Sequence, residues 1–279
     1  MKTSLTEPVV RSILLGACAL TLTVTAPAVV SAQTPPTSFP ANLPQRQGLQ
    51  MEMPQYSEDT VLQSVLAAET RPAADKARDA HRHPLETLTF WGLQPGLTVV
   101  EIEPGRAGWW RNILEPYAAQ TGGTYVPVNR PLEGMGVDDN TADMVVVARA
   151  FHNWHRAGVV DGYLQAFFKA LKPGGVLAIE QHRSIDGVNV ADVVATGYVP
   201  ESWVIHQARQ AGFELVGRSE INANAKDTKN HPFGVWSLPP VRRSEQDGRT
   251  LSADERAALD AIGESDRMTL LLRKPATAQ

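Results

Sequence analysis

From about residue 58 onward, the spacing of apolar residues switches repeatedly between the strand period and the helix period. A short β-branched apolar run predicts a buried strand at 97–102, and a second buried strand is expected at 144–148. Further strands are expected at 124–128, 176–180, 213–221 and 268–273. Apolar positions three or four residues apart predict helices at 60–69, 109–117, 159–171 and 200–211, and a charge-rich helix is expected at 72–90. This alternation predicts an α/β fold with a mostly parallel sheet.

Two prolines and one long insertion modify this pattern. Pro116 is predicted to end or kink the helix that begins after Gly108, and Pro127 marks 124–128 as a weaker strand because proline cannot donate to a ladder. Residues 223–265 form an insertion between the last two strands. Within it, Ser252 and Glu255 have capping-box spacing, which predicts a helix at 252–262.

The N-terminal segment has the pattern of an export signal. Lys2 and Arg11 precede an apolar stretch at 13–26, and the small residues Val30-Ser31-Ala32 follow it. We therefore expect a cleaved signal at 1–32, a Pro-rich linker at 33–57 and the folded domain at 58–279. The protein would be periplasmic or secreted, without stable membrane insertion after cleavage.

Two alternatives to simple cleavage remain open. The segment could be retained as an anchor helix, or it could be a lipoprotein signal, because Leu15-Gly16-Ala17-Cys18 resembles a lipobox. The lipoprotein reading is less favoured because only about six apolar residues lie between Arg11 and Cys18, fewer than signals usually have.

Composition limits the classes of function. The chain has 279 residues, of which 43% are apolar and 20% are charged, as in a folded globular protein. Its formal net charge of -4 argues against general attraction to nucleic acid. The small-molecule partner that we expect rests on the motifs described below. The single cysteine, Cys18, excludes an intrachain disulfide and a Cys-based zinc site. Nothing in the sequence indicates the oligomeric state.

The segment most informative about chemistry joins a strand to a helix through a glycine turn. It reads Val99-Val100-Glu101-Ile102-Glu103-Pro104-Gly105-Arg106-Ala107-Gly108. Glycines allow a ligand to approach the backbone closely, and the amides of a helix N-terminus are free to donate hydrogen bonds. A nucleotide-like ligand is expected at this turn.

Three motifs together resemble class I S-adenosylmethionine-dependent methyltransferases over about residues 70–274. They are the glycine turn, Asp138-Asp139-Asn140-Thr141-Ala142-Asp143-Met144-Val145, and Leu171-Lys172-Pro173-Gly174-Gly175-Val176-Leu177. Further segments, among them His152-Asn153-Trp154, look like a bacterial subgroup of exported predicted methyltransferases. The resemblance implies a Rossmann-like doubly wound sheet with an antiparallel last strand, S-adenosylmethionine as cofactor, and methyl transfer to an unidentified small acceptor.

The resemblance also implies the cofactor-binding residues and shows three departures from the family pattern. The implied residues are Glu101, Glu103, Pro104, Gly105, Arg106, Ala107, Gly108 and Asn129. Arg106 and Ala107 stand where small residues or glycine are usual. Asn129 stands where an acidic residue usually holds the ribose, and an amide has one acceptor oxygen and no charge. Only 14 positions separate Asn129 from Asp143, so the third strand is predicted to be reduced or missing.

Three residues are expected to be catalytic: His152, Asn153 and His182. His152 and His155 follow one predicted strand, and Glu180 and His182 end the next, so they should meet at the carboxyl edge of the sheet. Histidine suits a general base near neutral pH. The same histidines could instead hydrogen-bond loops, or could ligate a metal together with Glu180.

The sequence leaves several functions in competition with methyl transfer. A degenerate methyltransferase fold could serve as a ligand-binding or interaction module of the cell envelope, and the histidines would suit a metal-dependent hydrolase. A nicotinamide dehydrogenase is disfavoured because no acidic ribose residue follows the glycine turn. Arg78 and Arg82 either reach an anionic substrate or are solvated, and Trp154 and Trp236 are candidates to line a pocket.

Overall fold

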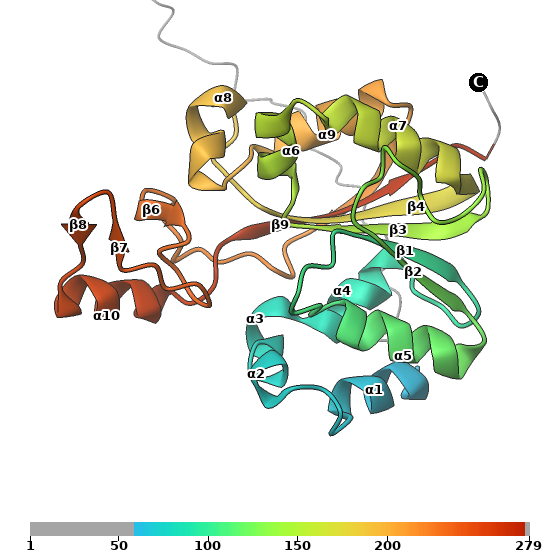
Figure 1. The fold of residues 1–279 in the computed structure, drawn as a ribbon, viewed down its shortest axis with the longest axis horizontal. Helices are drawn as coiled ribbons and strands as arrows, with labels where there is room; N and C mark the ends of the chain where they lie inside the picture. The colour runs from blue at the N-terminus through green and yellow to red at the C-terminus, as the bar shows by residue number, and fades with distance from the viewer. Residues whose placement is uncertain (1–58, 277–279) are drawn as a thin grey trace, which may run out of the picture. The chain divides into compact units, whose positions relative to one another are not determined.

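A computed structural model describes residues 59–276 of the chain, and these residues fold around a six-stranded sheet (Figure 1). The strand order is β2-β1-β3-β4-β9-β5. The bounds are Thr124–Val128 for β2, Thr98–Ile102 for β1, Ala142–Ala148 for β3, Leu171–His182 for β4, Arg267–Arg273 for β9 and Glu214–Ser219 for β5. Pairings β1–β2, β1–β3 and β3–β4 are parallel, whereas β9 runs antiparallel to β4 and β5. The predicted Rossmann-like sheet with an antiparallel last strand is confirmed.

The predicted export signal and linker lie outside the described residues.

Helices cover both faces of the sheet (Figure 1). One layer contains α6 (Phe151–Ala157), α7 (Val160–Ala170), α8 (Val190–Val193) and α9 (Glu201–Gln210), and the other contains α1 (Thr60–Ala67), α4 (Pro84–Trp91) and α5 (Arg111–Thr121). Alternation along β1 sends Val100 into the first core and Val99 into the second. No helix in this part of the chain is long and apolar enough to cross a bilayer.

The helix predicted at 72–90 is broken into three. These are α2 (Ala73–Lys76), α3 (Asp79–Arg82) and α4. His83 adopts a left-handed φ of 41°, and Pro84 occupies the first position of α4. A proline fits the first turn of a helix but not its interior, so a new helix begins at Pro84. The charged residues that had suggested one helix therefore lie in α2, in α3 and in the turn between them, before α4.

Pro116 was predicted to end or kink its helix, and the prediction that the helix ends there is wrong. α5 continues through Pro116 to Thr121 and is capped by Gly122. Pro116 removes one backbone hydrogen bond in the middle of the helix, and the buried side chains of Ile113 and Tyr117 on either side keep the helix packed on the sheet. Pro127 is tolerated in β2 because that strand is the edge of the sheet.

Between β2 and β3 the described chain carries no strand. This connection packs back on the sheet instead: Met135 is buried in the main core, and Gly136 leaves no room for a side chain beside Val126. β2 is therefore the outer strand on this side. That a third family strand has been lost here stays a prediction.

The expected insertion lies between β5 and β9 and has a small core of its own. It contains β6 (Pro232–Val235), the paired strands β7 (Glu245–Gln246) and β8 (Arg249–Thr250), and α10 (Ala253–Ile262). Ser252 and Glu255 form the predicted capping box at the start of α10. Leu238 and Leu259 belong to a core cluster separate from those on the sheet.

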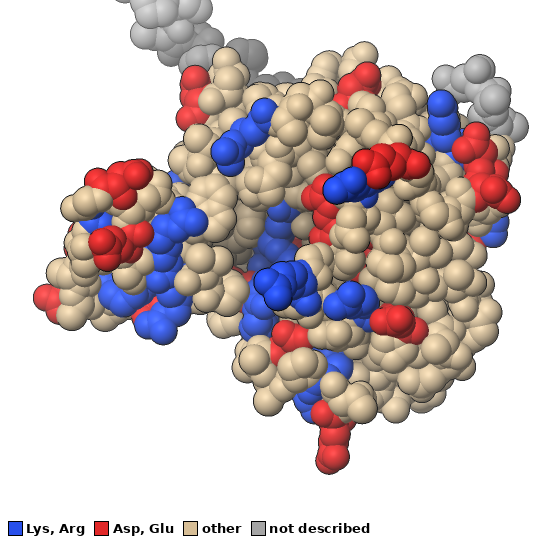
Figure 2. Space-filling view, viewed as in Figure 1, with Lys and Arg blue, Asp and Glu red and all other residues tan. Residues whose placement is uncertain are grey.

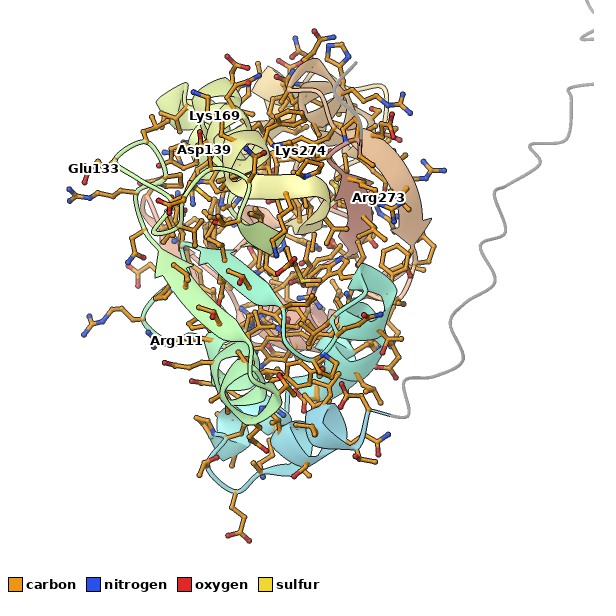
Figure 3. All side chains as sticks on the ribbon, turned by 90° about the vertical axis from the view of Figure 1, so that its right-hand side faces the viewer. Arg111, Glu133, Asp139, Lys169, Arg273 and Lys274 are labelled. Atoms are coloured by element: carbon orange, nitrogen blue, oxygen red, sulfur yellow. The ribbon has the colours of Figure 1, made fainter. Side chains whose placement is uncertain are left out.

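The residue after β9 ties the sheet to α7 at its amino edge. Nζ of Lys274 donates to the backbone carbonyls of Phe168 (2.7 Å) and Leu171 (2.8 Å) and to Oδ1 of Asn140 (2.6 Å). Lys274 is labelled in Figure 3, with Asp139 and Lys169 nearby. The lysine satisfies carbonyls that the end of a helix leaves without partners. A ligand site is therefore to be sought at the opposite edge of the sheet, where β1, β3 and β4 end.

Candidate functional site

A cavity of about 390 Å³ opens at the carboxyl edge of the sheet, between the sheet and the insertion. Figure 2 shows a hollow in this region with the blue of basic side chains inside it. Its walls come from the loop after β1, α3, the start of α6, the end of β4, the insertion and the residues before β9. Open α/β sheets bind ligands at this edge. The lining residues are Arg78, Arg82, Pro104, Gly105, Arg106, Ala107, Gly108, Trp109, Arg149, His152, Asn153, His182, Val235, Trp236, Pro239, Pro240, Val241, Glu264, Ser265 and Arg267.

The structure brings most of the expected site residues to this cavity. The three expected catalytic residues, His152, Asn153 and His182, all line it, and so do the five residues from Pro104 to Gly108. Glu101, Glu103 and Asn129 do not line it. Asn129 is exposed beyond the end of β2. The expected cofactor residues thus divide into a group at the cavity and a group away from it.

His152 lies in the first turn of α6. α6 begins immediately after β3, and its first backbone N–H, from Phe151, donates to Oε1 of Gln181 on β4. This contact fixes the start of α6 over the neighbouring strand, so that His152 in the first turn faces the cavity. His155, one turn later, packs edge-to-face against Trp203, with 5.3 Å between ring centroids, and does not line the cavity.

The two cavity histidines are uncharged at neutral pH. Burial lowers the pKa of His152 to about 4, with Arg156 and Arg149 lowering it further, and burial also holds the pKa of His182 well below its ordinary value. His182 shares a hydrogen bond of 2.6 Å between Nδ1 and the hydroxyl of Ser265. Within residues 59–276, Nδ1 of His152 is buried without a hydrogen-bond partner. A neutral imidazole can take a proton from a ligand during a reaction, but the lowered pKa makes it a weaker base than an ordinary histidine.

Two buried glutamates organise the arginines around the histidines. Oε2 of Glu180 accepts from Nη1 of Arg149 at 2.9 Å, and its Oε1 lies 2.8 Å from Nε of Arg267. The backbone of Arg149 is left-handed, with φ of 56°, and its N–H donates to the carbonyl of Glu180 at 2.7 Å. Glu180 therefore lies beneath the cavity as a structural anchor and does not line it.

Glu264 holds a second group of arginines. Its carboxylate accepts from Nε of Arg78 (2.8 Å), Nε of Arg82 (2.9 Å) and Nη1 of Arg267 (2.6 Å). Burial alone would raise the pKa of Glu264, but Arg267 and Arg78 hold it below its ordinary value, so the group is ionised. Arg149, Glu264, Ser265 and Arg267 were not predicted as site residues, because their partners lie far away in the sequence and no local pattern marks them.

The crevice at the switch point of the sheet is bridged by side chains. The order of strands reverses between β1 and β3, which is where such folds usually bind nucleotides. Here Glu103, with a left-handed φ of 51°, follows β1 and accepts a hydrogen bond of 3.1 Å from Nε1 of Trp154 on α6. Trp154 is buried in the core and does not line the cavity, whereas Trp236 does.

Glu101 is a buried carboxyl group at the end of β1. Only 2% of it is exposed, and its Oε2 accepts a hydrogen bond of 2.7 Å from the hydroxyl of Tyr125. Burial raises the pKa of Glu101 to about 7, although Tyr125 and Arg149 act in the opposite direction. Its position beneath the loop makes Glu101 a support for the site and not part of the cavity wall.

Glu101→Gln is expected to stabilise the protein above about pH 7. Because the folded pKa is about 7 and the ordinary value is 4.5, ionisation of Glu101 removes stability as the pH rises between these values. Glutamine keeps an acceptor for Tyr125 and carries no charge. We expect a gain of about 2 kcal/mol in the free energy of unfolding at about pH 8 and none at about pH 4.5, measured by urea denaturation. Glu115→Gln, at an exposed position on α5, is the control. Equal effects of both variants at each pH would contradict this assignment.

The described residues hold no group of three or more His, Cys, Asp or Glu side chains placed to bind a metal ion. The residues that had suggested a metal-dependent hydrolase have different surroundings: His155 packs edge-to-face against Trp203, and Glu180 is paired with arginines. The hypothesis of a metal-dependent hydrolase rested on these residues meeting at one site, and their positions do not support it.

Comparison with known proteins gives similarity to solved structures only. No protein-family model matches the chain, and no curated protein matches it. A protein provisionally assigned as a sarcosine dimethylglycine methyltransferase from Galdieria sulphuraria is 14% identical, with a TM-score of 0.46, covering 74% of this chain and 89% of that one. The [4+2]-cyclase SpnF is 16% identical at a TM-score of 0.43, with 74% and 82% covered. A SAM-dependent methyltransferase from Aquifex aeolicus is 16% identical at 0.39, with 58% and 93% covered. These values assign neither a family nor an activity.

Proposed function

We propose that this protein transfers a methyl group from S-adenosylmethionine to a small acceptor molecule bound in the cavity. One observation carries the proposal: the glycine loop and the neutral histidine His152 line the same cavity at the carboxyl edge of the sheet. A loop that can hold a cofactor is thereby placed beside a group that can accept a proton.

The loop residues fit the methionine part of the cofactor. Gly105, Arg106 and Ala107 are exposed at the N-terminal side of α5, so their backbone groups and the Arg106 guanidinium are available to a carboxylate. Asn129 is the residue that would meet the ribose, with one acceptor oxygen in place of the two of a carboxylate. When bound, S-adenosylmethionine supplies a methyl group already activated by its positive sulfur, so orientation by the protein supplies much of the rate.

His152 is proposed as the general base that takes the proton from the acceptor. Its unpartnered Nδ1 is the atom available for this, and its low pKa keeps the ring neutral at pH 7. Asn153, beside it, would orient the acceptor, and His182, held by Ser265, would complete the wall. His152→Gln is expected to lower kcat by about 10² to 10⁴-fold with little change in cofactor affinity.

Titration calorimetry with S-adenosylmethionine and its demethylated product tests the proposal. Gly105 has a left-handed φ of 68° and open space around its missing side chain, so Gly105→Asp places a charge in the loop without a steric clash. We expect micromolar binding to the wild type and at least about tenfold weaker binding to this variant, since the added carboxylate repels the carboxylate of the cofactor. Gly96→Asp is the control, at an equally open left-handed position at the amino end of β1. Absent or millimolar binding to the wild type would overturn the proposal.

The bridge between Glu103 and Trp154 favours a second candidate function, in which the cavity binds its ligand without catalysis. This bridge lies across the crevice where the adenosine half of a nucleotide would otherwise enter. The protein would then be a ligand-binding or interaction module of the cell envelope. Binding of a small ligand to a protein that binds neither S-adenosylmethionine nor its product would identify this case.

We further propose export, with cleavage near Ala32, so that the mature chain begins near Gln33. The N-terminal pattern of two basic residues, an apolar stretch and small residues supports this location. Mass spectrometry of the protein from a fractionated native host tests it. Recovery of an unprocessed N-terminus on cytoplasmic protein would overturn it.

A further inference from the structure

The arginines of the cavity carry more positive charge than their partners balance. Arg78, Arg82, Arg149 and Arg267 line the cavity, while the carboxylates paired with them are those of Glu180 and Glu264. His152 and His182 are neutral. Counted by contact ion pairs, four arginines therefore face two carboxylates, and Arg106 on the exposed loop adds a further positive charge. Glu101, with a pKa of about 7, offsets part of this surplus near Arg149. Charge that is partly removed from water requires a partner.

Among the described residues, four buried polar atoms of the cluster make no hydrogen bond. Two of them, Oε1 of Glu180 and Nε of Arg267, lie 2.8 Å apart as an ion pair, so two are left. These two are Nη1 of Arg82 and Nδ1 of His152, which are buried without a partner in this part of the chain. Arg82 is 3% exposed and His152 is 5% exposed, and both residues line the cavity. Buried donors and acceptors of this kind are rare in folded proteins and call for a group that the protein itself does not provide.

The charged side chains are also fixed in place. Arg78 and Arg82 each donate through Nε to Glu264, which leaves the outer nitrogens of both guanidinium groups for another acceptor. The ring of Trp109 lies under Arg82, with its centroid 4.9 Å from the guanidinium carbon. This arrangement is a built site and differs from a group of solvated surface arginines.

From these observations we propose that the cavity binds a small molecule carrying two negative charges, held by Arg78, Arg82 and Arg149 beside His152. A phosphate monoester and a dicarboxylate share this chemistry. A dianion balances the surplus charge, and the partly exposed guanidinium groups of Arg78 and Arg149 can donate to it from the cavity wall. Only the statement that this dianion is the methyl acceptor rests on the proposed function; the binding site itself does not.

The charges of the two ligands also predict the order in which they bind. S-adenosylmethionine carries one more positive than negative charge, so the empty cluster of arginines repels it, and a bound dianion removes that repulsion. The dianion is therefore expected to bind to the protein without cofactor and to increase the affinity for S-adenosylmethionine, not to compete with it.

Titration calorimetry without cofactor tests the site, with inorganic phosphate and succinate as dianions and acetate as a monoanion, at about pH 7.5. We expect a dianion to bind more tightly than about 1 mM and acetate to bind at least about tenfold more weakly. Arg82→Gln is expected to weaken dianion binding by about 10- to 100-fold, because it removes a charged hydrogen bond. Preference between phosphate and succinate identifies which dianion chemistry the site accepts.

Arg130→Gln is the matched control, because it removes the same charge from a side chain that is 75% exposed and outside the cavity. Arg78→Gln is a second test, at a partly exposed arginine, should Arg82→Gln fail to fold. Equal weakening by Arg78→Gln and Arg130→Gln, no dianion binding by the wild type, or equal binding of acetate would each overturn the proposal. Dianion binding by a protein that does not bind S-adenosylmethionine would support this site and overturn the proposed methyl transfer.

Discussion

Arg267→Met is expected to lower the free energy of unfolding by about 3 to 5 kcal/mol. Arg267 is 1% exposed and contacts both Glu180 and Glu264, which are themselves 0% and 4% exposed. It also donates to the backbone carbonyl of His81. Methionine fills much of the volume but leaves two buried carboxylates with fewer cationic partners. Thermal or urea unfolding measures the change, and a fall in Tm of roughly 10 °C is expected.

Two further variants separate loss of charge pairing from general damage to β9. Arg273→Met makes the same substitution at an exposed position of the same strand and is expected to change stability by less than about 0.5 kcal/mol. The double variant Arg267→Met with Glu180→Gln should recover part of the loss, because one uncompensated carboxylate is removed. A double variant with the summed effect of the two single substitutions would contradict pairing as the cause.

Gly234→Ala is expected to cost about 3 kcal/mol and to loosen the insertion. Gly234 has a left-handed φ of 59°, and an added Cβ would lie 2.7 Å from Cα of Thr196. This close approach seats β6 against the turn after α8. Because Val235 and Trp236 line the cavity, the substitution should also weaken ligand binding there.

Limited proteolysis together with urea unfolding measures the effect of Gly234→Ala. Faster cleavage within 220–266 is expected, since the insertion would open more often. Gly248→Ala is the control, because Gly248 is also left-handed and lies in the same insertion but has open space around it. If Gly248→Ala has the same effect, strain in φ and not the contact with Thr196 is responsible.

The sheet could be predicted from local sequence because its buried strands are short, mostly apolar runs. Met144 to Val147 on β3 and Met268 to Leu272 on β9 are almost completely buried, so continuous apolar runs mark them without alternation. The capping box of α10 is equally local, and it forms as predicted. The glycine loop and His152 reach one cavity because parallel strands end at one edge.

Features that depend on tertiary partners were beyond prediction. The sequence does not show that Arg267 reaches Glu180, since the two meet only when β4 and β9 pair in antiparallel register. Glu103 occupies a left-handed position usually taken by glycine, and only its contact with Trp154 explains what its side chain does there. The presence of Pro116 predicted that its helix ends or kinks there, but packing on the sheet keeps α5 helical through this residue.

The carboxylate of Glu264 has a consequence for the affinity of the cavity. It holds the guanidinium groups of Arg78 and Arg82 in place before any ligand arrives. Free arginine side chains lose about 0.5 to 1.5 kcal/mol each when a ligand immobilises them. Here that loss of entropy has already occurred during folding. A ligand therefore meets a preorganised surface, and most of the free energy of its contacts is available for binding.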